Sequence, residues 1–520
     1  MSNASGKVRA VYEALETRKN KQALKLLAPL LEKKPTNAQL RILKALALIR
    51  LGRKDEALKL SRELKTLADV ENDVSLLNNL AIVFREAGVP SEATECFVSA
   101  LNQQPNNEEL ALCVFQSYGR ERNFLKQQQL AQKLHKQLGN PCYVLWSIVC
   151  TTLQVLEGAP TKLLLLAERQ MAKRAEEGKL ATIEELQLYL EILERQDKFT
   201  EALAVVEGDC GALYTSAVER KQRQAALLCS LERWDDARGT YQALLDLNEG
   251  QVKGREEWSH VRGVIHCAMQ ARGIKPVPNL PLGGSIGGSG GAGTGGPTDT
   301  DHVGVGAEDW AWVADHGGKL VTWLFEQQEQ ENVKTRTPYL AEVELLTHLA
   351  LLKGEAPDGP TVAQALDAIR KYFSAFGGKD VCAYDLAVPL SRLPPSTRLP
   401  LAASLEPLAE DPEGAAADGA SPAFERACTR AANLAKLQRM LGCMDGWAAA
   451  RAVAEVRAQV GAVSACAARL SRRDGFPADR TPADDNCLVA ARVLLDLYKA
   501  DGDEKWLYEA ALVARFGLQV

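Results

Sequence analysis

Residues 73–107, DVSLLNNLAIVFREAGVPSEATECFVSALNQQPNN, contain two stretches of helical periodicity with a turn between them. Apolar side chains recur at helical spacing, at Leu77, Leu80, Ala81 and Phe84 in the first stretch and at Ala93, Phe97 and Ala100 in the second. Gly88 follows the first stretch, where a left-handed residue commonly ends a helix, and Pro105 stops the second. The small side chains of Ala81 and Ala93 let the two helices cross closely. The stretch therefore predicts a helical hairpin.

The same hairpin pattern recurs along the first half of the chain. Ala23 and Ala57 are 34 residues apart, Ala57 and Ala93 are 36 apart, and Ala202 and Ala237 are 35 apart. This period, with its order of large and small residues, is typical of tetratricopeptide repeats. We therefore predict an all-α, tetratricopeptide-like helical solenoid, a superhelix of helix pairs. Its first parts are N-terminal tetratricopeptide repeats in 1–138 and tetratricopeptide-like repeats in 139–272.

A glycine-rich stretch, PLGGSIGGSGGAGTGGPTDT at 281–300, matches the G-x-G-x-x-G spacing of phosphate-binding loops. Such a loop needs a strand before it and a helix opening at its end. Here prolines flank the stretch and no Lys-Ser/Thr pair follows. Gly/Ser-rich composition buries too little apolar surface to order itself. The sequence therefore predicts a Gly/Pro-rich flexible linker over 273–306 that interrupts the solenoid.

Helical periodicity returns after the predicted linker and continues to residue 520. The expected helices cover 309–331, 338–353, 361–376, 380–393, 423–444, 446–471, 485–500 and 503–518. The joints between them include RLPPSTRLP (392–400), which we expect to be a loop. We assign 307–520 as a continuation of the solenoid, and we expect it to be C-terminally incomplete because nothing there resembles a polar capping helix.

Composition and cysteine usage indicate a cytoplasmic protein. The chain is 46% hydrophobic and 25% charged, with a net charge of −5. The longest apolar run, Cys142–Leu156, is too short for a membrane span and is expected to be a buried helix. The first 20 residues lack a secretory signal pattern. None of the 12 cysteines has C-x-x-C spacing, so we expect reduced core cysteines.

A search for catalytic chemistry yields no candidate site. The six histidines are scattered without an H-E-x-x-H motif, and no G-x-S-x-G motif is present. The carboxylate pairs Glu184–Glu185 and Glu342–Glu344 are expected on solvated helix faces. The tryptophans are expected to pack in the core, and one alternative stays open: Trp310 and Trp312 are two residues apart, so they cannot both face one core and one of them serves a partner. We therefore predict no catalytic, cofactor-binding or metal-binding residues, and a chain that is not itself an enzyme.

Several segments in order resemble one family. In residues 165–208 these are LAER (166–169), ELQLY (185–189) and ILER (192–195). Further on they are RTPYLAEVELL (336–346), YFSAFGGKDVCAYDL (372–386) and LLDLYKADGDEKWLYEA (494–510). Together they resemble the non-catalytic auxiliary subunit of the N-terminal acetyltransferase B complex (NatB). The resemblance covers most of the chain and is weakest in 395–480.

The resemblance implies a partner and a reaction. Auxiliary subunits of this family wrap and activate a small catalytic acetyltransferase, which acetylates nascent chains that begin with Met followed by Asp, Glu, Asn or Gln. Acetyl-CoA and the catalytic residues belong to that partner. Three near-matches to its phosphate-binding signature, at 85–90, 439–444 and 472–477, each fail at the last position. Family members continue well beyond the length seen here. Two alternatives stay open: the auxiliary subunit of another N-terminal acetyltransferase, and a tetratricopeptide adaptor for chaperone or receptor tails.

The N-terminal end is strongly basic. Residues 1–65 contain 16 Lys/Arg and 6 Asp/Glu, a net charge of +10, although the whole chain carries −5. The residues near helix ends and loops that can project together are Arg18, Lys19, Lys21, Lys25, Lys33 and Lys34. A solvated face is one interpretation. Because an enzyme that acts on nascent chains benefits from docking near the tunnel exit, we predict that these six residues face ribosomal RNA.

Overall fold

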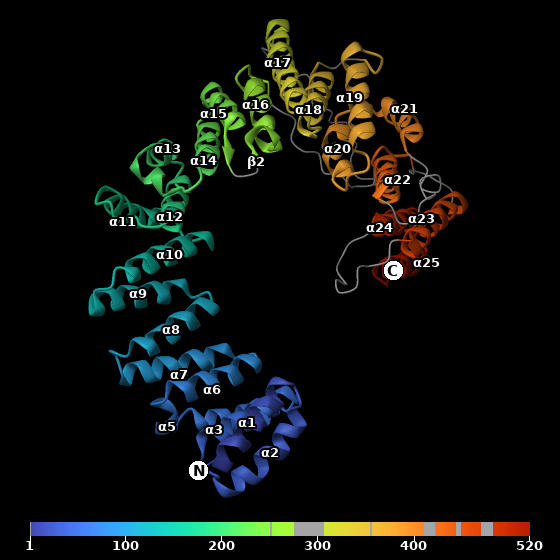
Figure 1. The fold of residues 1–520 in the computed structure, drawn as a ribbon. Helices are drawn as coiled ribbons and strands as arrows, with labels where there is room; N and C mark the ends of the chain where they lie inside the picture. The colour runs from blue at the N-terminus through green and yellow to red at the C-terminus, as the bar shows by residue number, and fades with distance from the viewer. Residues whose placement is uncertain are drawn as a thin grey trace. The chain divides into compact units, whose positions relative to one another are not determined.

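The protein is almost entirely helical in its computed structural model. The structure describes residues 2–249, 252–274, 306–353, 356–409, 422–443, 449–469 and 482–519. The strands within these ranges are β1 (Asn248–Glu249) and β2 (Val252–Lys253), which pair antiparallel. The chain divides into two compact units, Met1–Val205 and Val206–Val520. Within each unit, helices that follow one another in the chain lie side by side (Figure 1).

The helices of the first unit are α1 (Ser2–Glu16), α2 (Asn20–Lys33), α3 (Ala38–Arg50), α4 (Lys54–Leu64), α5 (Ala68–Glu71), α6 (Val74–Glu86), α7 (Pro90–Gln103), α8 (Glu108–Arg120), α9 (Phe124–Leu138), α10 (Cys142–Leu156), η1 (Thr161–Leu163), α11 (Leu164–Glu176), α12 (Ile183–Glu194) and α13 (Phe199–Glu207). The boundary between the units falls near the end of α13.

The hairpin predicted in 73–107 is formed by α6 and α7. The Asp73 side chain accepts hydrogen bonds from two backbone N–H groups in the first turn of α6, which fixes the start of that helix. Gly88 follows its end with φ +75°, in the left-handed region. Phe84 and Phe97 are fully enclosed between the helices, and Ala81 is buried beside them. The repeat prediction is confirmed here, because the positions that set the period are the positions that form the core.

The repeat alanines mark the closest packing in the other hairpins as well. Ala23, Ala57, Ala202 and Ala237 have no exposed surface. Any larger side chain there would have to push two helices apart, at a typical cost of about 1–3 kcal/mol.

The helices of the second unit are α14 (Ala217–Ser230), α15 (Trp234–Asp246), α16 (Trp258–Gln270), α17 (Ala307–Glu331), α18 (Thr337–Leu352), α19 (Pro360–Phe376), α20 (Cys382–Ser391), α21 (Pro395–Leu405), α22 (Pro422–Met440), α23 (Ala449–Arg469), α24 (Pro482–Asp501) and α25 (Lys505–Gln519), with short 3₁₀ turns η2 (Asp209–Leu213), η3 (Gly254–Glu256) and η5 (Glu406–Leu408). Besides sequential neighbours, α16 packs on α18, α18 on α20, α20 on α22 and α22 on α24. Contact between every second helix is the arrangement of a stacked solenoid.

One predicted loop is wrong. Most of RLPPSTRLP (392–400) lies in α21 rather than in a joint. Pro395 occupies the first position of that helix, where a missing N–H costs nothing, and Pro400 removes a single internal hydrogen bond. Leu401 and Leu405 bury their side chains and hold the helix in place. The prolines of this segment therefore start a helix instead of preventing one.

Other sequence predictions fall outside the described residues. The glycine stretch 281–300 lies there with most of the predicted linker, so the predicted domain boundaries stay predictions. The 11 cysteines whose side chains the structure describes are free thiols. Among the helices described, none has both the length and the apolarity that crossing a membrane requires.

Candidate functional surfaces and a buried ion-pair centre

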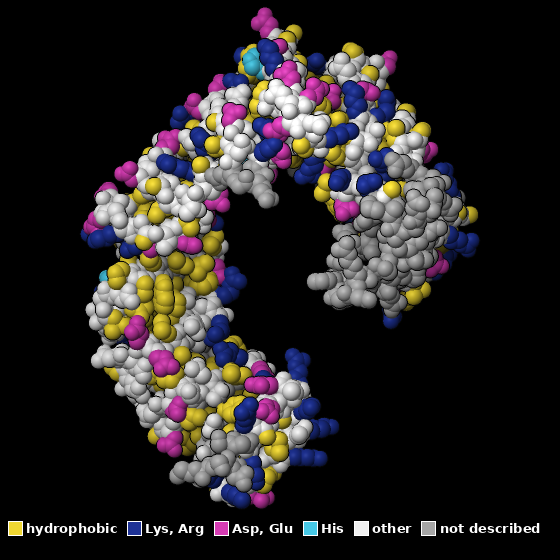
Figure 2. All heavy atoms as spheres, in the orientation of Figure 1, with side chains coloured by type: hydrophobic (Ala, Val, Ile, Leu, Met, Phe, Trp, Pro, Cys, Tyr) yellow, Lys and Arg dark blue, Asp and Glu magenta, His cyan; other side chains and the backbone are white. Residues whose placement is uncertain are grey.

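The six predicted ribosome-facing residues lie on and around α2. Arg18 and Lys19 form the turn before α2, Lys21, Lys25 and Lys33 belong to the helix, and Lys34 follows it. All six side chains are exposed. Figure 2 shows Lys and Arg side chains projecting from this group of helices. The structure thus brings the six residues to one element, and we call them the α2 basic surface.

The six residues of the α2 basic surface differ from nearby arginines in their charge pairing. Nearby arginines are paired: Arg41 with Glu63 and Arg50 with Glu86. Within the described part of the chain, none of the six residues of the α2 basic surface forms an ion pair. Lys21 and Lys25 are one helical turn apart, a like-charge pair that costs an isolated helix about 0.2–0.5 kcal/mol. The surface therefore presents uncompensated positive charge, which an anionic partner would neutralise.

A second surface is apolar and lies on α10. This helix contains no charged residue. Leu145, Val149, Leu153 and Leu156 follow one another at four, four and three residues, which places them on one face. Val149 is 38% exposed and Leu156 is 50% exposed, and the other two are partly exposed. Figure 2 shows hydrophobic side chains gathered over α9 and α10. We call these four residues the α10 stripe.

The polar side of α10 is turned inward. Ser147 and Thr151 are buried, and glutamines of α9 donate to them: Gln132 Nε2 lies 3.3 Å from Ser147 Oγ and Gln128 Nε2 lies 2.7 Å from Thr151 Oγ1. Tyr143, Ile148, Cys150 and Val155 are buried on α10 as well, so the helix is apolar on both its buried and its open side. The prediction that Cys142–Leu156 is a buried helix is therefore only half right, because one side of the helix is buried and the α10 stripe on its other side is open. Contiguous exposed apolar surface of this kind is typical of interaction sites.

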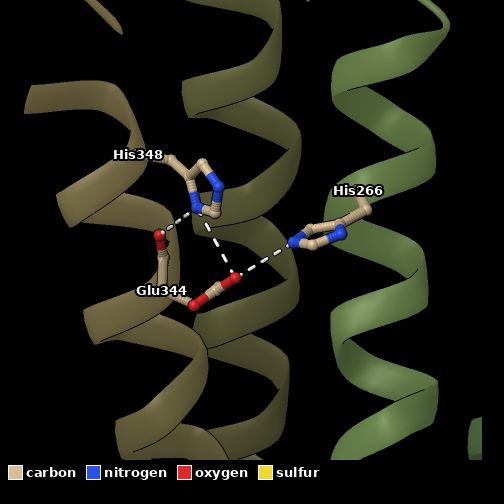
Figure 3. A group of neighbouring side chains, drawn as sticks. All are labelled: His266, Glu344 and His348. Atoms are coloured by element: carbon tan, nitrogen blue, oxygen red, sulfur yellow. Dashed lines mark hydrogen bonds and ion pairs between the residues drawn. The ribbon is translucent and has the colours of Figure 1, made fainter. Parts of the chain in front are cut away.

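Unpredicted by the sequence, a buried ion-pair centre forms around Glu344 of α18 (Figure 3). The Glu344 side chain is only 3% exposed. Arg392, at the end of α20, donates from Nη1 to Oε2 at 2.8 Å and from Nη2 to Oε1 at 3.2 Å. His266 of α16 places Nε2 3.0 Å from Oε1, and His348 lies one turn beyond Glu344 on the same helix. The centre joins three helices of the second unit.

The expectation that Glu344 lies on a solvated face is wrong. Helix α18 packs against α16, α17, α19 and α20, so almost every side of it is covered. Burial of the Glu344 carboxyl works to raise its pKa, but the hydrogen bond with His266 and the positive charge of Arg392 together outweigh burial. They hold the pKa well below its usual range. The carboxylate is therefore charged at any physiological pH, and its partners are required to keep it buried.

The same residues provide a possible set of metal ligands. One ligand atom from each of His266, Glu344 and His348 lies within 4.8 Å of the others. However, Arg392 occupies both carboxylate oxygens, and Arg262 Nε lies 3.5 Å from Oε1. A divalent cation would have to approach two guanidinium groups, which Coulomb repulsion opposes. The residues fit an ion-pair centre better than a metal centre. The absence of metal-binding residues stays a prediction.

Two further sequence expectations concern specific residues. Trp310 and Trp312 both pack, partly buried, against the core that α16, α17 and α18 share, so the prediction of core packing is confirmed and the alternative, that they cannot both face one core, is wrong. The Arg272 guanidinium lies 4.2 Å from the centroid of the Trp312 ring, and the His316 ring stacks on Trp312.

The near-match at 85–90 is the turn between α6 and α7, where Pro90 begins α7 without an N–H for a phosphate.

Comparison with known proteins gives two family matches. Residues 6–245 match the Psidin N-terminal TPR repeats region, and residues 314–520 match the N-acetyltransferase B complex (NatB) non catalytic subunit. One similar curated protein is the N-terminal acetyltransferase B complex auxiliary subunit NAA25 of Arabidopsis thaliana, which is 27% identical over 99% of this chain and 46% of its own length. Another is the N-alpha-acetyltransferase 25, NatB auxiliary subunit of Homo sapiens, which is 25% identical over 98% of this chain and 50% of its own length.

The chain spans about half the length of these curated relatives. Among solved structures, one described as Naa15/Naa10 bound to HypK-THB covers 99% of this chain and 78% of its own, with 15% identity and a TM-score of 0.43. At this level of similarity the likeness says nothing about partners.

Proposed function

Because this chain belongs to the family of non-catalytic auxiliary subunits of the N-terminal acetyltransferase B complex, we propose that it binds and activates a small catalytic acetyltransferase. The chain supplies the scaffold, and the partner supplies the acetyl-CoA site and the catalytic residues. The substrates of the complex are nascent chains that begin with Met followed by Asp, Glu, Asn or Gln.

The observation that best supports a protein partner is the α10 stripe. An apolar face left open on a helix whose hydroxyls are buried costs hydration free energy unless something covers it. The stripe is uncharged and has the spacing of residues that pack against another helix. Exposed leucines continue just beyond it, at Leu163, Leu165 and Leu166. A globular enzyme that presents an apolar helix would cover this surface.

The α10 stripe is tested by charge substitution in the coexpressed complex. Val149→Glu with Leu156→Glu places two carboxylates on the open face and should reduce recovery of the tagged acetyltransferase at least tenfold, because burying unpaired charge is costly. Leu399→Glu is the control, since Leu399 is 59% exposed and belongs to α21 rather than to the stripe. Undiminished recovery with the double variant would show that the partner does not use the stripe.

We further propose that the α2 basic surface docks the complex on the ribosome, which places its action in the cytoplasm. Uncompensated charge on six neighbouring residues supports this, since phosphate neutralisation releases counterions. The same surface also favours a second candidate function, an adaptor that binds acidic tails of chaperones or receptors. Identification of the proteins that copurify with the tagged chain separates the candidates: a NatB-type catalytic subunit, another N-terminal acetyltransferase, or a chaperone.

A further inference from the structure

Two cysteines far apart in the sequence touch in the second unit. The Sγ atoms of Cys229, on α14, and Cys267, on α16, are 3.7 Å apart. Cys267 is 3% exposed, whereas Cys229 is only half-buried. A disulfide needs a sulfur–sulfur distance of about 2.05 Å, so a small approach of the two side chains would bring them to bonding distance. Neither thiol belongs to the surfaces or the ion-pair centre described above.

The surroundings of the pair distinguish its two thiols. Tyr241 of α15 lies directly over Gly263 of α16, where a Cβ would come within 2.6 Å of the tyrosine ring. The missing side chain at Gly263 thus admits the ring, and the Tyr241 hydroxyl hydrogen-bonds Cys229. The hydrogen bond from Cys267, followed by that from Tyr241, lowers the pKa of Cys229 against the effect of burial. The more accessible thiol is therefore the one that ionises and reacts first.

We propose that Cys229 and Cys267 form a redox pair that a peroxide converts to an intramolecular disulfide. In the first step the Cys229 thiolate attacks one oxygen of hydrogen peroxide, the O–O bond breaks, and Cys229 sulfenic acid and hydroxide result; the hydroxide takes up the proton that Cys229 lost on ionising and becomes water. In the second step the Cys267 sulfur attacks the Cys229 sulfur, the S–O bond breaks, and water leaves with the Cys267 proton. Two thiols are oxidised, one peroxide is reduced, and the net products are one disulfide and two waters.

The bond would join α14 to α16 across α15. The two cysteines are 38 residues apart, and closing such a loop restricts the unfolded chain, so the oxidised form should be the more stable one. Cys267 is also the neighbour of His266, which contacts Glu344 of α18. One turn of α16 would then be fixed covalently to α14 and by ionic contacts to α18.

The experiment uses the reduced full chain treated with stoichiometric hydrogen peroxide. Remaining thiols are alkylated, and the digested chain is analysed by mass spectrometry. The expected result is a peptide pair cross-linked through Cys229 and Cys267, an intact mass lower by two hydrogens, reversal by dithiothreitol, and a higher melting temperature after oxidation. Cys229→Ser and Cys267→Ser should each abolish the cross-link. Cys210→Ser, which removes another half-buried thiol outside the pair, should retain it.

Alkylation of both thiols after peroxide treatment would overturn the proposal. So would Cys229 oxidised to the sulfinic acid, or a cross-link to a different cysteine. If a serine variant fails to fold, mapping the cross-linked cysteines in the wild-type chain is sufficient to decide the question.

Discussion

The imidazole of His348 is enclosed in α18 with its Nδ1 3.0 Å from the Glu344 carbonyl oxygen. Its Nε2 has no hydrogen-bond partner among the described residues. Burial, followed by the nearby charge of Arg392, lowers the pKa of His348 to about 3. The titratable and charged groups around it are Glu344, Arg392 and His266, and Arg262 Nε lies 3.5 Å from the Glu344 Oε1. His348 therefore stays neutral in the folded protein.

Because of His348, the free energy of unfolding should decrease as the pH is lowered. Below about pH 6.5 an unfolded histidine takes up a proton, which the folded centre excludes down to about pH 3. The unfolded state then binds more protons, so the unfolding free energy should drop by about 2 kcal/mol between pH 7 and pH 5. Urea unfolding of the full chain at both pH values measures this drop.

His348→Gln should flatten the pH dependence, because it removes the group that titrates. His316→Gln is the control, since its side chain is 37% exposed and lies outside the centre. An equal drop in wild type and in His348→Gln would contradict the assignment.

Sequence reasoning did not find the ion-pair centre because its members come from distant positions. His266 is 78 residues from Glu344, and Arg392 is 48 residues beyond it. Nothing in a local pattern marks such a meeting. What could have raised doubt is α18 itself, PYLAEVELLTHLALL, where two glutamates, Glu342 and Glu344, interrupt an apolar stretch that offers no polar face for both of them.

At the scale of elements, the helices that follow repeat spacing could be predicted from the sequence. The orientation of α10 and the existence of α21 could not. The α6–α7 hairpin is fixed by local chemistry: a cap at Asp73, a left-handed Gly88 and small residues at the crossing. The orientation of α10 depends on glutamines supplied by α9, so its apolar run alone could not tell a buried face from an open one. Helix α21 was missed because Pro400 reads as a helix breaker.

The α2 basic surface carries the prediction at this scale. Arg18→Glu, Lys19→Glu, Lys21→Glu and Lys25→Glu together should abolish cosedimentation with ribosomes at moderate salt while the catalytic subunit stays bound. Binding of the wild type should weaken steeply with salt, as expected when phosphate counterions are released.

The control for that variant changes the same charge elsewhere. Lys162, Arg169, Lys173 and Lys179 are exposed basic residues around α11, and their replacement by Glu should leave cosedimentation intact. Equal loss in both variants would indicate non-specific attraction, and no loss in the first would leave the α2 basic surface as a solvated face.

At the scale of the whole molecule, the solenoid and the family could both be predicted, because repeat spacing and the ordered segments such as 185–189 and 372–386 persist in the sequence. The exposed basic residues could also be predicted from charge, but the α10 stripe could not, since its exposure depends on how the helix is rotated about its axis. The described residues of the first unit carry the α2 basic surface and the α10 stripe, and those of the second unit carry the ion-pair centre. None of these supplies a nucleophile beside a general base, which is the arrangement that acyl-transfer catalysis by a protein side chain requires.

The most direct test of the account is acetylation of a peptide that begins with Met-Asp, measured with purified components and acetyl-CoA. We expect no acetylation by this chain alone, weak acetylation by the catalytic subunit alone, and at least tenfold faster acetylation when the two form a 1:1 complex. A peptide that begins with Ser-Ala should remain unmodified by the complex. Acetylation of the Met-Asp peptide by the isolated chain, or no rate increase on mixing with the catalytic subunit, would contradict the proposed function.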